Sequence, residues 1–249
     1  MTARASFHFT GTQALITGGT SGIGYATALL FRDAGAAVTI TGTKPAATDY
    51  DVELSGMTYH PLRMTDHESV DALVQNFTLL DVLVNNAGAN FPDGLDESKP
   101  DGFEASVALN LTGPYRLTVG LYRALRASTA IGGASVVNMA SMSALRAVPL
   151  VPGYGAAKAG VIDVTRNLAV KWAAKGIRVN AVAPGTIDTP MTAPLHIAQE
   201  LVASELAHIP FGRFGTVGEI APTVAFLCTE QSRYTSGAVF VVDGASDCV

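Results

Sequence analysis

The sequence predicts a single α/β domain whose strands form one parallel sheet. Short apolar runs rich in β-branched residues alternate with longer stretches of helical spacing along all 249 residues. This alternation is typical of βαβ units, in which helices connect parallel strands through right-handed crossovers. No linker, internal repeat or low-complexity tract interrupts it, so residues 1–249 are expected to form one domain.

About seven strands are expected, each about the length of a strand that is buried on both faces. They cover residues 13–17, 37–41, 58–62, 81–86, 134–140, 177–184 and 238–244. Helical spacing covers residues 22–34, 103–127, 154–175 and 217–228. The connection from 41 to 58 is rich in Gly, Pro and Asp, so it should hold a short helix or none.

The composition argues against several classes of protein. Hydrophobic residues make up 48% and charged residues 15%, the profile of a large core, and subunit contacts are expected to cover some of the remaining apolar surface. The net charge is −5 and the basic residues are scattered, so nucleic acid and membranes are not expected partners. The longest uncharged stretch, 127–145, is too polar for a membrane span.

Cysteine and histidine usage favours a reduced cytoplasmic protein without a metal. Cys228 and Cys248 have neither metal-ligand spacing nor enough company for a disulfide framework. The five histidines show no ligand spacing either, so no metal site is expected. The first residues lack the apolar core of a signal peptide, which agrees with a cytoplasmic location.

A glycine-rich turn follows the first expected strand and opens a helix. Gly18, Gly22 and Gly24 form the pattern G-x-x-x-G-x-G. Glycines permit the turn and let the backbone approach a pyrophosphate, while the helix N-terminus favours an anion. The position of this turn directly after an N-terminal strand predicts a nucleotide-binding site.

The segment TGGTSGIG, residues 17–24, resembles the T-G-x-x-x-G-I-G turn of the short-chain dehydrogenase/reductase family. Further motifs of that family match in order: NNAG at 85–88, Y-x-x-x-K at Tyr154 and Lys158, and the P-G loop in 183–191. The resemblance, which is to members like the 3-oxoacyl-(acyl carrier protein) reductases, runs from about residue 9 to 244. It implies a Rossmann-type doubly wound domain, hydride transfer with a nicotinamide cofactor, and a homotetramer.

Tyr154 and Lys158 lie one helical turn apart, on one face. A nearby cation favours the phenolate, so Tyr154 is expected to have a lowered pKa and to act as general acid or base on a carbonyl or alcohol. Ser141 would hydrogen-bond the substrate oxygen. The resemblance adds that Lys158 holds the nicotinamide ribose and that Asn110 kinks its helix and holds a water beside the lysine.

The cofactor preference depends on the end of the second strand. An acidic residue there binds the ribose 2′-hydroxyl of NAD, but this chain has Gly42, followed by Thr43 and Lys44, which suit a 2′-phosphate. NADP is therefore favoured. NAD is the alternative, because many NADP-using relatives carry a basic residue where this chain has Ser21.

The resemblance also assigns the other cofactor contacts. Arg63 stands where the family has an Asp against the adenine, so either Arg63 stacks on the adenine or Asp66 takes that place. The expected cofactor-binding residues are Gly18, Thr20, Ser21, Gly22, Ile23, Gly24, Thr43, Lys44, Arg63, Met64, Asn86, Ala87, Gly88, Tyr154, Lys158, Pro184, Gly185, Ile187 and Thr189.

Substrate selectivity is expected to come from three segments, including a loop at about 189–211. The residues are Asn90, Phe91, Ser141, Met142, Val148, Tyr154 and Met191. This mostly apolar lining predicts an uncharged or partly hydrophobic ketone or secondary alcohol. Arg146 would admit an acidic group if it faced inward.

Three functions remain open. The leading one is an NADP-dependent ketone reductase, and the second is an NAD-dependent dehydrogenase of a sugar or cyclic alcohol. The third is a nucleotide-bound regulator without turnover, which the complete set of Asn110, Ser141, Tyr154 and Lys158 disfavours.

Overall fold

A computed structural model describes residues 5–197 and 199–249 of the chain. In this part, seven strands form one parallel sheet in the order β3-β2-β1-β4-β5-β6-β7, which confirms the expected doubly wound fold. The strands are β1 Gln13–Ile16, β2 Ala37–Gly42, β3 Met57–Pro61, β4 Val82–Asn85, β5 Ala134–Met139, β6 Ile177–Pro184 and β7 Val239–Val242. The strand order reverses between β1 and β4, and ligands of such sheets bind beyond the carboxyl ends of the strands at this point.

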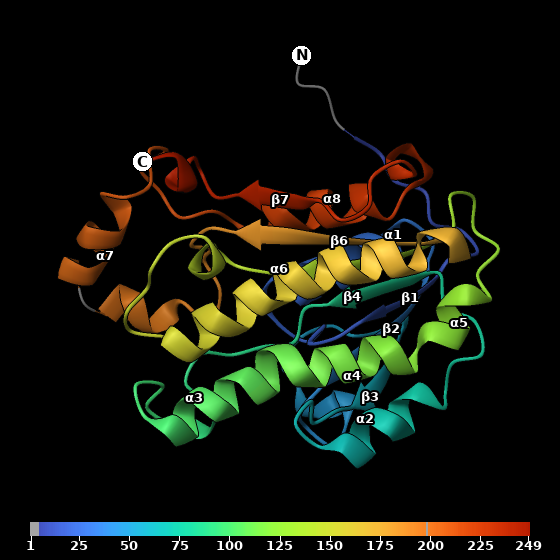
Figure 1. The fold of residues 1–249 in the computed structure, drawn as a ribbon, viewed down its shortest axis with the longest axis horizontal. Helices are drawn as coiled ribbons and strands as arrows, with labels where there is room; N and C mark the ends of the chain where they lie inside the picture. The colour runs from blue at the N-terminus through green and yellow to red at the C-terminus, as the bar shows by residue number, and fades with distance from the viewer. Residues whose placement is uncertain (1–4, 198) are drawn as a thin grey trace.

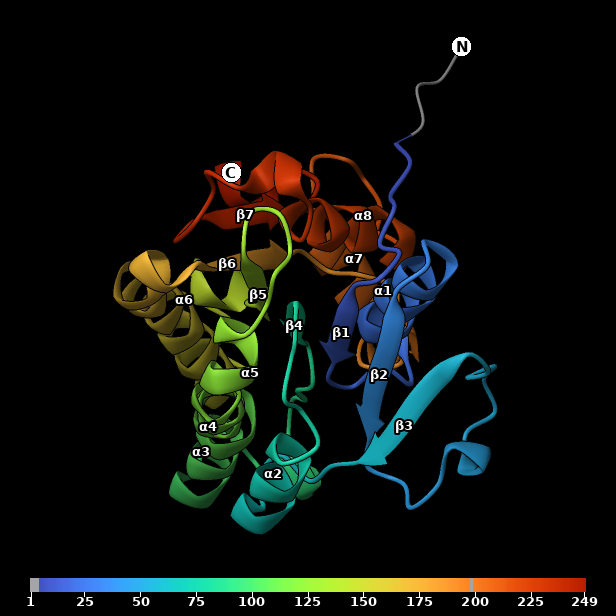
Figure 2. The ribbon, with the colours of Figure 1, turned by 90° about the vertical axis from the view of Figure 1, so that its right-hand side faces the viewer.

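Helices cover both faces of the sheet, as Figures 1 and 2 show. One layer contains α1 and α8, and the other contains α2, α4, α5 and α6, with α3 beside α6 (Figure 2). The helices are α1 Gly22–Asp33, α2 His67–Val74, α3 Pro100–Val107, α4 Gly113–Gly120, α5 Tyr122–Arg126, α6 Pro152–Trp172, α7 Gln199–Leu206 and α8 Val217–Leu227. None of those formed by the described residues has the length and hydropathy that crossing a bilayer requires.

Two regions differ from the sequence-based expectation. The helix expected over 103–127 is divided into α3, a π-helical turn at Ala108–Thr112, α4 and α5. The interruption falls at Asn110, whose side chain bonds to backbone outside its own helix. The expected loop at 189–211 contains a 3₁₀ turn, Ala193–Ile197, and α7. By contrast, the connection after β2 holds only the short turn Ala47–Asp49, as expected.

A buried polar chain fixes two helices on the sheet. Asn85 on β4 donates to Thr118 on α4 at 2.7 Å and to Asn138 on β5 at 2.8 Å. Asn138 in turn donates to Thr165 on α6 at 2.9 Å. Most buried polar groups are paired in this way, although Asn85 Oδ1 has no partner among the described residues. The chain of bonds therefore sets where α4 and α6 lie, and α6 carries Tyr154 and Lys158.

Candidate active site

The glycine turn between β1 and α1 is shaped for close backbone approach. Gly18 and Gly22 have left-handed backbones, with φ of 64° and 52°. A Cβ on Gly24 would overlap the Asn86 side-chain nitrogen and the carbonyl oxygen of Gly18. The turn is therefore a cradle that side chains would fill, and its N–H groups begin a helix. These are the features that fit a pyrophosphate.

The NNAG segment is tied directly to this turn. Asn86 Nδ2 donates to the carbonyl oxygens of Thr17 and Gly18 at 3.0 and 3.2 Å. The Thr17 hydroxyl accepts from the backbone N–H groups of Asn86 and Ala87, both at 3.0 Å. The Asn86 amide nitrogen thus holds the turn in shape, and residues 86–88 form the opposite wall of the cradle.

Gly88, Asn110 and Lys158 meet at one point. A Cβ on Gly88 would lie 2.5 Å from Asn110 Oδ1 and 3.6 Å from Lys158 Nζ. Asn110 is 1% exposed; it donates to the Ala89 carbonyl at 2.9 Å and accepts from the Ala89 N–H at 3.1 Å. Asn110 therefore fixes the backbone beside the lysine. A water-holding role for it stays a prediction.

Ser141, Tyr154 and Lys158 come together beyond the carboxyl end of β5. Lys158 Nζ lies 5.4 Å from the centre of the Tyr154 ring and donates to the Met139 carbonyl at 2.7 Å. Ser141 caps the 3₁₀ turn Met142–Ala144, and its hydroxyl interacts with Tyr154. A Cβ on Gly155 would lie 2.9 Å from the Ser143 carbonyl, so the first turn of α6 packs closely on this segment.

The pKa of Tyr154 differs from the expectation of a lowered value. Burial raises the pKa of Tyr154 to about 12, although its hydrogen bond with Ser141 lowers it. Burial also lowers the pKa of Lys158 to about 8. The Lys158 ammonium donates to the Met139 carbonyl, and desolvation of the phenol is the largest cause of the raised pKa of Tyr154. In the protein alone, Tyr154 therefore keeps its hydroxyl proton at neutral pH.

At the adenosine end, the structure reveals a residue that sequence reasoning missed. A Cβ on Gly42 would overlap the hydroxyl of Tyr50, so this phenol fills the space of the family's acidic side chain. The hydroxyl accepts from the Lys44 N–H at 2.9 Å, and Lys44 Nζ lies 4.8 Å from the ring centre. Tyr50 lies in an aperiodic connection, so no local pattern indicated its position. Thr43 and Ser21 are exposed beside it, and Thr20 is buried.

The two candidates for the adenine contact are now distinguishable. Asp66 Oδ1 accepts from the Glu68 N–H at 3.0 Å and caps α2, so this carboxylate is engaged in its own helix. Arg63 is exposed. Met64 is 4% exposed, and its carbonyl oxygen faces α4, where a Cβ on Gly113 would overlap it. Of the two side chains, Asp66 is engaged as a helix cap, so Arg63 is the better candidate for the adenine contact.

The turn after β6 lies beside the glycine turn. A Cβ on Gly22 would lie 3.4 Å from Thr189 Cγ2. The Ile187 carbonyl accepts from the Thr192 hydroxyl at 2.6 Å, a partner that the sequence did not indicate. Pro184 ends β6, and a Cβ on Gly185 would lie 2.7 Å from Asp243 Cα, so this turn packs tightly against the end of β7.

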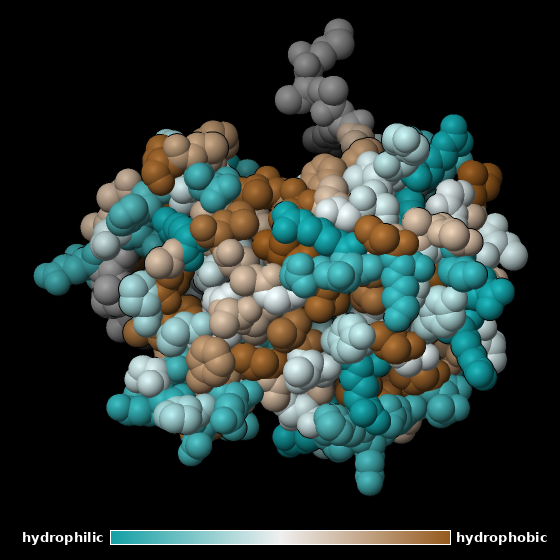
Figure 3. Space-filling view, in the orientation of Figure 1, coloured by the Kyte–Doolittle hydropathy of each residue, from teal (hydrophilic) through white to brown (hydrophobic). Residues whose placement is uncertain are grey.

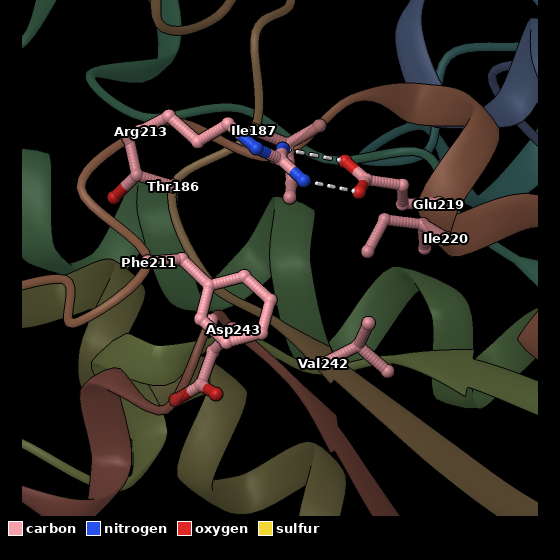
Figure 4. Close-up of a pocket in the computed structure, with 10 residues that line it drawn as sticks. Thr186, Ile187, Phe211, Arg213, Glu219, Ile220, Val242 and Asp243 are labelled. Carbon is pink, nitrogen blue, oxygen red and sulfur yellow. Dashed lines mark hydrogen bonds and ion pairs between the residues drawn. The ribbon is translucent and has the colours of Figure 1, made fainter.

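A small pocket of about 100 Å³ lies beside this turn. Figure 4 shows the residues that line it. Thr186 and Ile187 line it, together with Arg213 and Glu219, which form an ion pair with an N–O distance of 2.6 Å. Arg213 and the Thr216 cap lower the pKa of Glu219 to about 2. Ser141, Tyr154 and Lys158 are not among its lining residues, so this pocket is separate from the site around Tyr154.

The residues expected to contact the substrate lie in three segments of the chain. Asn90 and Phe91 follow Gly88, Met142 and Val148 lie between β5 and α6, and Met191 follows β6. Among the described residues, the buried side-chain atoms without a partner include Asn90 Oδ1, two residues after Gly88. Met142 is 4% exposed and Met191 is 44% exposed, so only Met191 is open to solvent.

Arg146 pairs with the segment after β6. Its Nη2 donates to Glu205 Oε1 at 2.8 Å, and the same oxygen accepts from the Thr186 hydroxyl at 2.5 Å. Glu205 on α7 thus connects the segment after Ser141 with the turn after β6. The sequence predicts a loop over residues 189–211, so no helical pattern indicated Glu205.

Comparisons with known proteins cover nearly the whole chain. The family model described as enoyl-(acyl carrier protein) reductase matches residues 18–245. The 3-oxoacyl-(acyl carrier protein) reductase of Thermotoga maritima is 37% identical, covering 94% of this chain and 97% of its own. The cis-4-hydroxycyclohexanecarboxylate dehydrogenase of Sinomonas cyclohexanicum is 38% identical over 95% and 96%. A gluconate 5-dehydrogenase from Burkholderia cenocepacia, solved with NADP and tartrate, superposes with a TM-score of 0.86 at 28% identity, covering 98% of both chains.

Proposed function

Since the chain belongs to the short-chain dehydrogenase/reductase family, we propose that it reduces ketones with NADPH and uses Tyr154 as the general acid. As a member of this family, it is an oxidoreductase of carbonyl and alcohol groups that uses a nicotinamide dinucleotide. The observation that carries the finer proposal is the meeting of Ser141, Tyr154 and Lys158 beside Gly88, at the end of a glycine cradle.

The chain's own residues supply the proton and the orientation. The nicotinamide, when bound, supplies the hydride. Tyr154 donates its hydroxyl proton to the substrate oxygen, which Ser141 holds by a second hydrogen bond. Lys158 binds the ribose of the cofactor and compensates the phenolate that remains. Asn110 keeps residues 88–89 in place. The turn at 18–24 holds the pyrophosphate, and the turn at 184–189 holds the nicotinamide end.

The 2′-phosphate selectivity is proposed to depend on Lys44. Position 42 carries no carboxylate, and the Thr43 and Lys44 side chains are exposed beside Tyr50. We expect the wild-type enzyme to prefer NADPH to NADH. Lys44→Ala should lower kcat/KM for NADPH about tenfold, the effect of losing about 1.4 kcal/mol of phosphate contact, and leave kcat/KM for NADH unchanged.

Steady-state kinetics of the wild type and of Lys44→Ala measure kcat/KM with NADPH and with NADH. Lys175→Ala, which removes an exposed lysine from the turn that ends α6, is the matched control and should leave both values unchanged. A wild-type preference for NADH would overturn the NADP assignment.

A second candidate is the oxidation of a cyclic or sugar alcohol with NAD. The observation in its favour is Arg146, whose Nε is buried without a partner among the described residues, in the segment after Ser141. This guanidinium could receive an acidic group of a substrate, and one relative at 38% identity is a dehydrogenase of a cyclic hydroxycarboxylate. A panel of ketones, sugars and cyclic hydroxy acids, assayed in both directions, separates the two candidates. Arg146→Met also removes the ion pair with Glu205, so it should lower kcat/KM for all substrates, and more for the acidic ones than for the uncharged ones.

We further propose a cytoplasmic homotetramer in which residues 189–211 shape the substrate site. Apolar side chains gather over α3, α4 and α6 on the face in Figure 3, and the exposed ones include Phe103, Tyr115, Val119 and Val170, which is 83% exposed. Apolar faces of this kind favour subunit contact. Light scattering should give four times the chain mass of 25.7 kDa, and Val170→Glu should lower it. A monomeric wild-type protein would contradict the proposal.

A further inference from the structure

Glu97 is a buried carboxylate that the proposed chemistry does not use. It is 1% exposed and lies in the segment before α3. Its Oε2 accepts from the backbone N–H of Tyr154 at 2.7 Å, and its Oε1 accepts from the N–H of Phe91 at 2.9 Å. Buried acidic groups are tolerated where such partners exist. One side chain therefore ties the backbone of Tyr154 to that of Phe91.

The first turn of α6 has no cap of its own. Val151 at the N-cap makes no side-chain bond, and Pro152 has no N–H. The free N–H groups and the dipole at this end of a helix favour a negative charge, which Glu97 brings from another segment. Gly153 permits this approach, because a Cβ there would lie 3.1 Å from Glu97 Oε2.

The other end of the bridge is a strained turn. Phe91 and Asp93 have left-handed backbones, with φ of 48° and 54°. Non-glycine residues keep this conformation only where their surroundings hold it, and such strain gathers at functional sites. Glu97 holds the turn at Phe91, next to Asn90 with its buried and unpaired oxygen.

We propose that Glu97 is a positioning residue that keeps the Tyr154 hydroxyl in register with the substrate by tying α6 to the 90–94 turn. This rests on the roles proposed for Tyr154 and for the turn. The negative charge of Glu97 also acts on the phenol: burial is the main cause of the raised pKa of Tyr154, and Glu97 adds to the rise.

The remaining charges around Tyr154 are few. Lys158 lies 5.4 Å from the ring centre on α6 itself. The segments 108–112 and 142–144 and strand β5 contain no charged residue. The charged side chains on the other elements packed against α6 include Asp101 and Glu104 of α3, which are exposed, and Arg178 of β6, which bonds backbone carbonyls of 227–235.

Glu97→Gln is the informative variant. An amide has one oxygen, so it can accept from only one of the two N–H groups and faces the other with its own donors. Because small misplacements of a catalytic group cost up to about 100-fold, kcat for ketone reduction should fall about 10–100-fold. Loss of the negative charge lowers the pKa of Tyr154, so the alkaline rise of alcohol oxidation, which needs the phenolate, should shift to lower pH.

Further variants separate the positioning role of Glu97 from a merely structural one. Glu97→Asp keeps the negative charge, so it should lower kcat without shifting the pH profile of alcohol oxidation. Glu104→Gln removes an exposed carboxylate of α3, and it should change neither kcat nor this pH profile. Wild-type kcat and pH profile in Glu97→Gln would overturn the proposal, as would a fall in thermal stability with an unshifted profile. Activity retained by Tyr154→Phe would instead refute the proposed role of Tyr154 itself.

Discussion

Tyr154→Phe is expected to abolish turnover in both directions while leaving cofactor affinity nearly unchanged. The phenyl ring keeps the buried volume of the side chain and removes only the hydroxyl. Lys158 keeps its hydrogen bond to the Met139 carbonyl, so the position of the lysine is preserved. Proton transfer by a positioned group is worth about 10²–10⁴-fold, and kcat should fall by at least that factor. Steady-state kinetics and calorimetric titration with NADPH measure the two quantities separately.

The control is Tyr234→Phe, because Tyr234 is fully exposed and lies outside the site. It should behave as the wild type in both measurements. Retained turnover in Tyr154→Phe would refute the general-acid assignment, whereas a large loss of affinity would show that the hydroxyl mainly binds the cofactor.

The second large effect is expected at the glycine cradle, in Gly24→Ala. The added Cβ would overlap the Gly18 carbonyl oxygen and the Asn86 side-chain nitrogen. The first is backbone, which cannot move aside as a flexible side chain can, so α1 must shift and the bond from Asn86 to Gly18 must break. Overpacking of this kind costs about 1–3 kcal/mol, which corresponds to a Tm lower by about 2–4 °C per kcal/mol in a protein of this size. NADPH affinity should fall at least about tenfold.

Gly218→Ala is a matched control for this variant. Gly218 lies in the first turn of α8, and the nearest atom to an added Cβ is the Thr216 hydroxyl oxygen at 3.9 Å. Alanine is the better helix former, so Tm should be unchanged or slightly higher, with unaltered cofactor affinity. Wild-type Tm and affinity in Gly24→Ala would contradict the description of the cradle.

The features that sequence reasoning predicted are those with a local signature. Strands β4, β5 and β6 are buried along their whole length, which is why they appear as short, mostly apolar runs. The glycine turn requires its residue types for steric reasons, so its pattern is visible in the sequence. The carboxyl ends of parallel strands meet at one edge of the sheet. The predicted fold therefore places Gly88, after β4, and Ser141, after β5, at the same edge.

Residues that the sequence did not reveal act across the fold, from segments that the sequence predicts to be connections or loops. Tyr50 occupies the space beside Gly42 from the connection after β2, Glu97 reaches Tyr154 from the segment before α3, and Glu205 reaches Arg146 from α7. For a single Tyr or Glu in such a segment, no sequence pattern predicts which residue it contacts. The raised pKa of Tyr154 was missed for a related reason, because burial is a property of the folded chain.

The central claim is that this chain is a working NADPH-dependent ketone reductase. It is tested most directly by incubating the wild-type protein with NADPH and a panel of uncharged ketones, then quantifying the NADPH consumed and the alcohol formed. The predicted result is equimolar consumption and formation with at least one ketone. Tight NADPH binding without consumption by any ketone, and without cofactor reduction by any alcohol, would contradict the claim.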